Sequence, residues 1–237
     1  MYCFDSVVRY SEIDAENYMT LPSVLDLLQD CCTFHSEELG IGIDFLRRAG
    51  RAWVLSFWQV RVKRFPRMGE KICAYTWPYD FKRFMGSRNF KIEDASRETI
   101  VFANSVWSYI DTGSGLPVRV PKEVRDRYVL EPPYEMERVE RKIRLPEDMR
   151  PREPIRVGRS LIDTNHHVNN GKYVMIAEEY LPMGFRTGEL RAEYKKAAVL
   201  SDVIYPKVTE LDGKVVVSLE NESGMPYTII EFMEDRT

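Results

Sequence analysis

Residues 163–173 read DTNHHVNNGKY and bring together several side chains that can take part in acid–base chemistry. An Asp, an Asn and a His alternate at Asp163, Asn165 and His167. If the stretch is a strand, this alternation sends all three side chains to the same side. Two further Asn follow, and Asn is a residue type that caps the exposed amides of a helix start. The pattern predicts a strand that runs into a helix, with three polar groups clustered at the junction.

A carboxylate, an amide and an imidazole beside a helix start can transfer an acyl group to water. A carboxylate or an imidazole takes a proton from the water, and the amide side chain positions it. The unpaired amides of the helix start carry partial positive charge and can hold a developing oxyanion. Any one of these residues alone is more typical of a cap or a turn. All three at this spacing favour the catalytic interpretation.

The elements that position these residues occur twice along the chain. Aligning Asp14 with Asp163 also matches a Ser and an Ile upstream, and each stretch runs into an apolar helix. Farther on, residues 62–72 and 194–204 share a basic pair, a hinge and a strand. Two matches in the same order indicate a duplicated unit.

Each unit is predicted to contain a strand, a helix and then several strands. In the first, residues 21–40 are apolar on most faces, have an early Pro and end at Gly40. In the second, a helix near Lys172–Leu181 precedes four strands, with hairpin turns at Asp212-Gly213 and Ser223-Gly224. The pattern predicts an α+β fold in which an antiparallel sheet curls around a central helix.

A proline-rich and highly charged segment separates the two units. Residues 121–154 contain six prolines, which is typical of a linker without a core of its own. We therefore expect an N-terminal unit over residues 1–120, a linker over 121–154 and a C-terminal unit over 155–237.

Composition argues against several classes of function. A net charge of −3 gives no electrostatic reason to expect a nucleic-acid partner. No run approaches the roughly 18 apolar residues that span a bilayer, and the N-terminus lacks the features of a signal or transit peptide, so we expect a cytoplasmic protein without membrane contact. The three histidines do not form a metal-binding pattern, and no nucleotide-binding loop is present, so we expect neither a metal nor a cofactor.

The pattern Asp-x-Asn-x-His-Val-Asn-Asn-x-x-Tyr, from Asp163 to Tyr173, resembles the signature of acyl–acyl carrier protein (acyl-ACP) thioesterases. The later stretch EYKK resembles a strand of the same family. The resemblance implies a tandem hotdog fold, with two long central helices that are each wrapped by an antiparallel sheet. It implies hydrolysis of fatty acyl-ACP thioesters at the end of fatty acid synthesis, with Asp163, Asn165 and His167 as catalytic residues.

The resemblance also implies a division of labour, in which the first hotdog shapes the acyl pocket and the second carries catalysis. At the triad positions the first unit has Asp14, Glu16 and Tyr18, so it keeps the carboxylate and loses the amide and the imidazole. We therefore expect one active centre per chain. Candidates for the wall of an acyl tunnel in the first unit are Leu25, Leu28, Cys32 and Trp53.

The sequence departs from the family pattern after EYKK. Family members usually carry a Glu there, followed in the plant members by a Cys, and this chain has Ala197 and Ala198. No cysteine lies beyond residue 73, so a cysteine nucleophile is excluded. Glu193 is a poor replacement, because four strand residues displace it by roughly 13 Å. Two helix carboxylates, Glu178 and Glu179, are conceivable substitutes, although exposed helix charge is the expected role of both.

Several alternatives stay open at this level. Either water or Asp163, through an anhydride, can attack the thioester. The carrier can be coenzyme A instead of ACP. Basic residues that could receive an acidic carrier are Arg61, Lys63, Arg64, Lys195 and Lys196. The Ala at position 197 also allows a non-catalytic acyl-binding module on the same fold, and a hotdog hydratase is a weaker option.

The other two histidines are expected to have no catalytic role. His166 should point away from its neighbours in the triad, and His35 lies on an apolar helix face, where a histidine is typically a satisfied core residue. Acyl chain length is a tertiary property that the sequence does not specify. A tandem chain already supplies paired hotdogs, so both a monomer and a homodimer are compatible with it.

Overall fold

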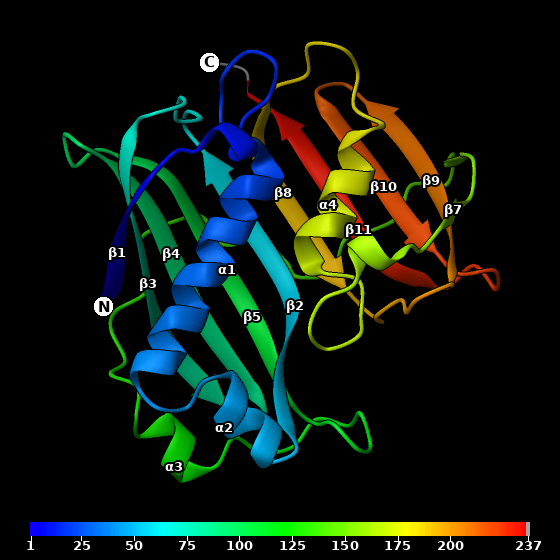
Figure 1. Ribbon diagram of the computed structural model, residues 1–237. Coiled ribbons are helices and arrows are strands. Elements are labelled where there is room, and N and C mark those ends of the chain that lie inside the picture. The colour runs from blue at the N-terminus through cyan, green and yellow to red at the C-terminus, as the bar shows by residue number, and fades with distance from the viewer. Residues whose placement is uncertain (236–237) are drawn as a thin grey trace. The chain divides into compact units, whose positions relative to one another are not determined.

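The computed structural model describes residues 1–235. Their contacts divide the chain into two compact units. Unit 1 comprises Met1–Ser56 and Val62–Arg138, and unit 2 comprises Phe57–Arg61 and the described residues from Val139 onward. Both units combine an antiparallel sheet with a central helix (Figure 1), which confirms the α+β class.

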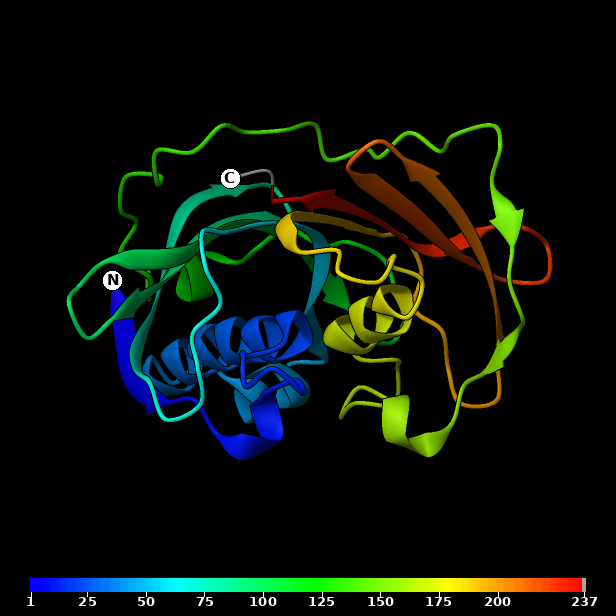
Figure 2. The same cartoon turned by 90° about the horizontal axis from the view of Figure 1, so that it is seen from above.

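Unit 1 is built on an antiparallel sheet in the order β1-β3-β4-β5-β2. These strands are β1 (Tyr2–Val7), β2 (Arg51–Val62), β3 (Lys71–Lys82), β4 (Met85–Asp94) and β5 (Thr99–Asp111). The helices are η1 (Tyr10–Glu12), α1 (Leu21–Glu38), α2 (Ile43–Arg48) and α3 (Lys122–Arg125). The central helix α1 lies on the concave side of this sheet (Figure 2).

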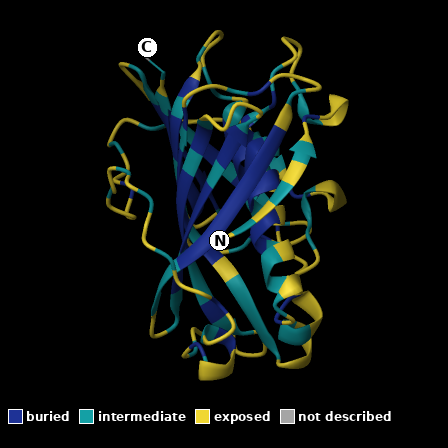
Figure 3. Ribbon diagram, turned by 90° about the vertical axis from the view of Figure 1, so that its left-hand side faces the viewer, coloured by how far each residue is buried: buried dark blue, intermediate teal, exposed yellow. Residues whose placement is uncertain are grey.

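Local sequence signals account for the limits of α1. The Thr20 side chain accepts a hydrogen bond from the amide of Ser23 and caps the helix start, and Pro22 occupies the first turn. Beyond the last turn, Gly40 has a φ of +70°, which a glycine adopts without steric cost. The exposed positions of α1, such as Asp26 and Asp30, recur at helical spacing, and Figure 3 shows the sheet beneath it largely buried.

Unit 2 has an antiparallel sheet in the order β2-β8-β11-β10-β9-β6, to which β2 contributes residues 57–61. The further strands are β6 (Arg150–Pro151), β7 (Ile155–Arg156), β8 (Thr187–Tyr194), β9 (Val203–Leu211), β10 (Lys214–Glu220) and β11 (Pro226–Glu234). The helices in the described part of this unit are η2 (Arg159–Leu161) and α4 (Asn170–Glu178). Glycines with positive φ, Gly213 and Gly224, form the two predicted hairpin turns.

The central helix of unit 2 is shorter than that of unit 1. Helix α4 has 9 residues, whereas α1 has 18. The sequence predicted a helix near Lys172–Leu181, and α4 begins two residues earlier and ends at Glu178. Helix α4 packs on β10 and β11, so each unit has one central helix against its own sheet, as predicted, although the second helix is not long.

The segment predicted as a linker has little regular structure and lies along both sheets. In unit 1, the Trp77 indole donates a hydrogen bond to the carbonyl of Pro132 at 2.9 Å. In unit 2, the amide of Ile143 donates to the Glu193 carboxylate at 2.9 Å. The segment therefore gains its order from the sheets that it covers. None of the helices in the described part of the chain is long and apolar enough to cross a bilayer.

Candidate functional site

Residues 163–169, the Asp163 loop, form a tight turn, and the expectation of a strand with alternating side chains is wrong at this point. The Asp163 carboxylate oxygen Oδ1 accepts hydrogen bonds from the amides of Asn165 at 2.8 Å and His167 at 3.3 Å. The Asp163 amide in turn donates to the carbonyl of His167 at 2.8 Å. An aspartate that satisfies nearby amides competes with a strand ladder, which is why the chain folds back here.

Loop closure therefore brings the three predicted residues together in place of strand alternation. His166 sits at the tip with a φ of +62°, a conformation in which His is enriched among non-glycine residues. The side chains of Asn165 and His167 are exposed, and Asp163 is partly buried. The Asn165 amide and the His167 imidazole are thus accessible to solvent, on a loop whose backbone is closed by hydrogen bonds to the Asp163 carboxylate.

The start of helix α4 adjoins the loop, as the sequence predicted. The Asn169 side chain accepts a hydrogen bond from the Gly171 amide at 2.8 Å and caps the helix. The Asn169 amide donates to the carbonyl of Leu161 at 2.9 Å, which ties the end of the loop to its beginning. The first amides of α4 provide partial positive charge beside the loop.

A second segment of unit 2, residues 195–202, supports the loop and is called the support segment below. The Val168 amide donates to the carbonyl of Ala198 at 2.9 Å, and His167 forms a β-bridge with Val199. The Ala198 amide donates to the Tyr173 hydroxyl at 2.7 Å. The two alanine positions noted in the sequence therefore lie in the segment that borders the loop.

A carboxylate on α4 differs from the sequence expectation. Glu178 is partly buried, and loss of hydration, followed by the nearby charge of Glu179, raises its pKa to about 8. We expected ordinary exposed helix charge at both positions, which is correct for Glu179 and wrong for Glu178. The apolar run Val-Met-Ile-Ala before Glu178 was the available signal, because a short helix that is apolar on most faces also buries the polar residue that follows.

Glu193 is engaged elsewhere, in agreement with the sequence argument. Its carboxylate accepts from the amide of Ile143 and pairs with Lys195 at 2.7 Å. Its neighbours along β8, Leu190 and Ala192, are fully buried, and strand alternation puts Glu193 on the opposite face of the sheet. A role for Glu193 in the Asp163 loop has no support from this geometry.

Most of the basic residues that could receive an acidic carrier are neutralised within their own unit. Arg61 pairs with Glu189 at 2.7 Å, Arg64 pairs with Glu70 and Asp94 at 2.7 Å, and Lys195 pairs with Glu193. Within residues 1–235, Lys63 and Lys196 are exposed and form no ion pair. These two side chains retain a free positive charge for a partner.

His35 is a core histidine with partners in unit 1. Its Nδ1 accepts a hydrogen bond from the Arg88 guanidinium at 3.1 Å, and its ring stacks on Tyr2. Burial and the positive charge of Arg88 lower the pKa of His35 to about 4. His35 is therefore neutral at pH 7 and structurally satisfied, as expected.

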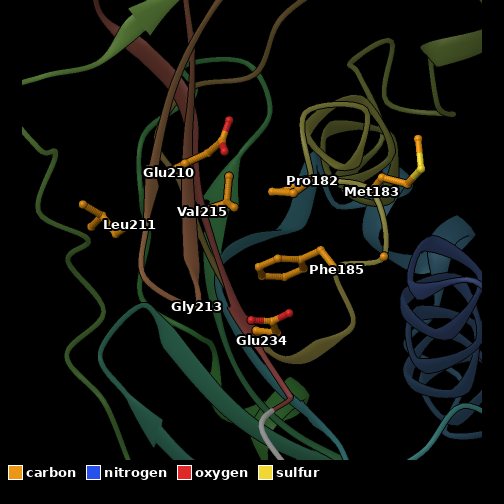
Figure 4. Close-up of a pocket in the computed structure, with 9 residues that line it drawn as sticks. Pro182, Met183, Phe185, Glu210, Leu211, Gly213, Val215 and Glu234 are labelled. Carbon is orange, nitrogen blue, oxygen red and sulfur yellow. The ribbon is translucent and has the colours of Figure 1, made fainter.

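Unit 2 also has a surface pocket, with a volume of about 210 Å³, formed by the loop after α4, the β9–β10 turn and the end of β11. In Figure 4, Pro182 and Phe185 face Val215 across it, and its charged groups are the carboxylates of Glu210 and Glu234. It contains none of the predicted catalytic residues. Among residues 1–235, no three His, Cys, Asp or Glu side chains are grouped so that they could hold a metal ion.

Comparison with known families gives two consecutive matches. The acyl-ACP thioesterase N-terminal domain matches residues 3–128, and the acyl-ACP thioesterase C-terminal domain matches residues 146–224. The two matched ranges together cover most of the chain, including the whole Asp163 loop.

Curated relatives are similar over nearly the full chain. A chloroplastic acyl-[acyl-carrier-protein] hydrolase of Cuphea viscosissima is 27% identical over 248 residues, which cover 97% of this chain and 58% of the relative. The chloroplastic oleoyl-acyl carrier protein thioesterase 2 of Arabidopsis thaliana is 26% identical over 246 residues, which cover 92% of this chain and 65% of the relative. The chain thus spans less than two thirds of the length of these relatives.

Solved structures share the fold. An acyl-ACP thioesterase from Bacteroides thetaiotaomicron superimposes with a TM-score of 0.89 at 22% identity, covering 98% of this chain and 97% of that one. The 12:0-ACP thioesterase from Umbellularia californica gives a TM-score of 0.87 at 17% identity, covering 99% and 96%. The fold is therefore the hotdog type, repeated in tandem along the chain.

Proposed function

Because the chain belongs to the acyl-ACP thioesterase family, we propose that it hydrolyses fatty acyl-ACP thioesters and releases a free fatty acid and holo-ACP. The observation that carries this proposal is the Asp163 loop. It presents the exposed side chains of Asn165 and His167 beside the capped start of α4, on a backbone that a carboxylate closes. Such groups can carry out acyl transfer to water.

In the proposed reaction, water attacks the carbonyl carbon of the thioester. His167 takes a proton from the water as the carbon–oxygen bond forms, and the carbonyl oxygen becomes an oxyanion. The Asn165 side-chain amide and the partial positive charge of the α4 start stabilise that oxyanion. As the carbon–sulfur bond breaks, His167 returns the proton to the leaving thiolate, so the products are a carboxylic acid and a free thiol.

The contacts of Asp163 favour water over Asp163 as the nucleophile. Its Oδ1 already accepts hydrogen bonds from two backbone amides, which fix the carboxylate in the loop and stabilise its negative charge. Both effects reduce its readiness to attack a carbonyl. We assign Asp163 the role of holding Asn165 and His167 in place and of providing negative charge near the imidazole.

Unit 1 supplies the acyl pocket in this proposal. Leu25, Leu28 and Cys32 are buried and follow helical spacing on one face of α1. Trp53 on β2 is half-buried against the ring of Tyr109, with 4.9 Å between ring centroids. These apolar residues are the candidates for contact with a fatty acyl chain.

The identity of the acyl carrier is the part of the proposal that has an alternative, because coenzyme A can also carry the acyl group. An acidic carrier protein would be attracted by the unpaired charges of Lys63 and Lys196, whereas coenzyme A requires no protein docking surface. A non-catalytic acyl-binding module is favoured by one specific observation, the Ala at position 197 where the family usually has a Glu. A single assay separates the three.

The test is release of free thiol from a ladder of acyl lengths, each on ACP and on coenzyme A. We expect turnover of acyl-ACP to exceed that of acyl-coenzyme A, and H167A to lower kcat about 10²- to 10⁴-fold through loss of the general base. H166N is the matched control, because it removes an imidazole from the same loop. Binding of acyl-ACP without thiol release would identify the binding module, and full activity of H167A would refute the assigned site.

A further inference from the structure

The Tyr173 hydroxyl is bonded to a backbone amide of the support segment. The Ala198 N–H donates to it at 2.7 Å, and both residues are buried, at 2% and 0% exposure. Burial raises the pKa of Tyr173, so the phenol keeps its proton at any working pH. The carbonyl of the same residue, Ala198, accepts the amide of Val168, next to His167. A short chain of hydrogen bonds thus runs from Tyr173 to the backbone that carries the imidazole.

Unit 1 closes its own copy of the loop without this hydrogen bond. There the Met19 amide donates to the carbonyl of Pro66 at 2.8 Å, as Val168 donates to Ala198 in unit 2. Pro66 has no N–H to donate. The residue aligned with Tyr173 in unit 1 is Val24, which has no hydroxyl.

Both partners of the hydrogen bond are therefore missing from the unit that lacks the amide and the imidazole, although the loop backbone there is closed in the same way. Closing the loop does not require the Tyr173–Ala198 bond. We propose that Tyr173 is a positioning residue for the reaction, and that its hydroxyl fixes Ala198 and through it the backbone of His167. This inference rests on the proposed function of the Asp163 loop.

The geometry explains how one hydroxyl can matter to a side chain that it does not touch. Tyr173 lies in the first turn of α4, and its ring packs edge-on against Tyr194, whose hydroxyl donates to the carbonyl of Asn170 at 3.1 Å. The Tyr173 ring is thus packed against a tyrosine that is itself hydrogen-bonded to the first residue of α4. Through Ala198 it couples the support segment to the helix whose partial positive charge is proposed to stabilise the oxyanion. Small displacements of catalytic groups can lower the reaction rate strongly.

The test begins with Y173F, which removes only the hydroxyl. We expect kcat to fall about 10- to 100-fold while KM stays within about twofold, because substrate binding does not use this group. Y128F is the matched control, since Tyr128 is a buried tyrosine of unit 1 whose hydroxyl bonds to Ser36 at 2.8 Å. Y128F should lose similar thermal stability and keep the wild-type kcat.

A198P provides the reciprocal change, because it removes the donor and copies the residue that unit 1 has at this place. If the two residues act through one hydrogen bond, the Y173F/A198P double variant is no slower than the slower single variant. Multiplicative losses, or a Y173F enzyme with wild-type kcat, would overturn the inference.

Amide hydrogen exchange tests the positioning role of Tyr173 without measuring catalysis. Y173F should accelerate exchange of the Ala198 amide at least about tenfold and broaden the ring resonances of His167, whereas Y128F should change neither. An unchanged Ala198 exchange rate would refute the positioning role. A wild-type protein that releases no thiol would refute the proposed function instead, so the two failures are distinguishable.

Discussion

The Asp14 loop of unit 1 (residues 14–20) and the Asp163 loop of unit 2 have the same backbone. The Asp14 carboxylate oxygen Oδ1 accepts hydrogen bonds from the amides of Glu16 at 2.9 Å and Tyr18 at 3.0 Å. The residue at its tip, Asn17, has a φ of 66°, close to that of His166 in unit 2. In both loops the aspartate closes the turn and a left-handed residue occupies the tip.

The two loops differ in whether a neighbouring side chain engages the residue at the third triad position. In unit 1, Arg67 donates a hydrogen bond to the Tyr18 hydroxyl at 2.8 Å and lies over its ring at 4.6 Å. In unit 2, the residue aligned with Arg67 is Val199, which has no polar group to occupy His167. The Asp is thus common to a loop with the proposed catalytic side chains and one without them, and the proposed chemistry resides in the positions of Asn165 and His167.

The largest expected effect on kcat comes from replacing the Asn and His side chains of the Asp163 loop by those at the aligned positions of unit 1. N165E/H167Y should lower kcat about 10³-fold, because both proposed reacting groups are lost, while the melting temperature stays unchanged, because the turn depends on Asp163. Thiol release and thermal melting measure the two quantities. The reverse change in unit 1, E16N/Y18H, is the control and should leave kcat unchanged. More than a tenth of the wild-type activity in N165E/H167Y would contradict the assignment.

Replacing the two aspartates separates closure of the turn from chemistry. D14A and D163A should each lower the free energy of unfolding by about 1–2 kcal/mol, because two amides lose their acceptor. Only D163A should also lower kcat. D163N keeps the acceptor oxygen, so we expect wild-type stability and at least about a tenth of kcat.

Urea denaturation and thiol release on the same preparations provide the measurements. A nucleophilic Asp163 predicts a different result, in which D163N is as inactive as H167A although the fold is intact. That outcome would replace the water mechanism by the anhydride route.

One position in the two central helices allows a comparison in which the free energy of unfolding depends on pH. Glu178 aligns with Gln29 in α1, so E178Q copies the residue of unit 1. The pKa of Glu178 is raised from 4.5 in the unfolded chain to about 8 in the fold, so the charged form destabilises the fold. The contribution of Glu178 to the free energy of unfolding therefore falls as pH rises from 4.5 to about 8 and is constant above that range.

E178Q should consequently increase the free energy of unfolding by about 2 kcal/mol at pH 9, once partial exposure of the group is allowed for, and leave it unchanged at pH 4. Urea denaturation at the two pH values measures the difference. E179Q, which changes the exposed neighbour, is the comparison variant and should give only a small part of this increase, because the charge of Glu179 is the lesser cause of the raised pKa of Glu178. An equal effect of E178Q at both pH values would show that Glu178 is not held protonated by burial.

The smallest effect is expected at the tips of the loops. H166N and N17H exchange residues that both tolerate positive φ, so each should change the free energy of unfolding by less than about 0.5 kcal/mol and kcat by less than about twofold. Denaturation and thiol release test this. A large loss of kcat in H166N alone would show that His166 has the catalytic role proposed for His167.

Local sequence signals were sufficient for several elements of the fold. The early Pro of α1, its apolar faces, the Gly40 that follows it and the two Gly-containing hairpins depend on neighbours in the chain, and each lies where it was predicted. The alignment of residues 62–72 with 194–204 also holds in the structure, where Gly69 and Ser201 share positive φ values of 79° and 75°.

The residue types of the candidate site were likewise readable from the sequence, because Asp, Asn and His before a helix cap form a local pattern. Their arrangement was not, since an alternating polar stretch is compatible with a strand as well as with an aspartate-closed turn. The choice depends on whether Val168 and His167 find partners in the support segment, about thirty residues away. The basic residues illustrate the same limit, because only the folded chain pairs Arg61 with Glu189.

By itself, the sequence determined which groups this protein can use and which elements border them: the triad types, the duplicated units, the helix starts and the turns. Only the tertiary structure decided how those groups are held. The burial of Glu178 and the hydrogen bond between Tyr173 and Ala198 exist because segments distant in sequence exclude water together. Propensity and capping act between neighbours in the chain, whereas desolvation and long-range hydrogen bonds depend on what the rest of the fold places beside each residue.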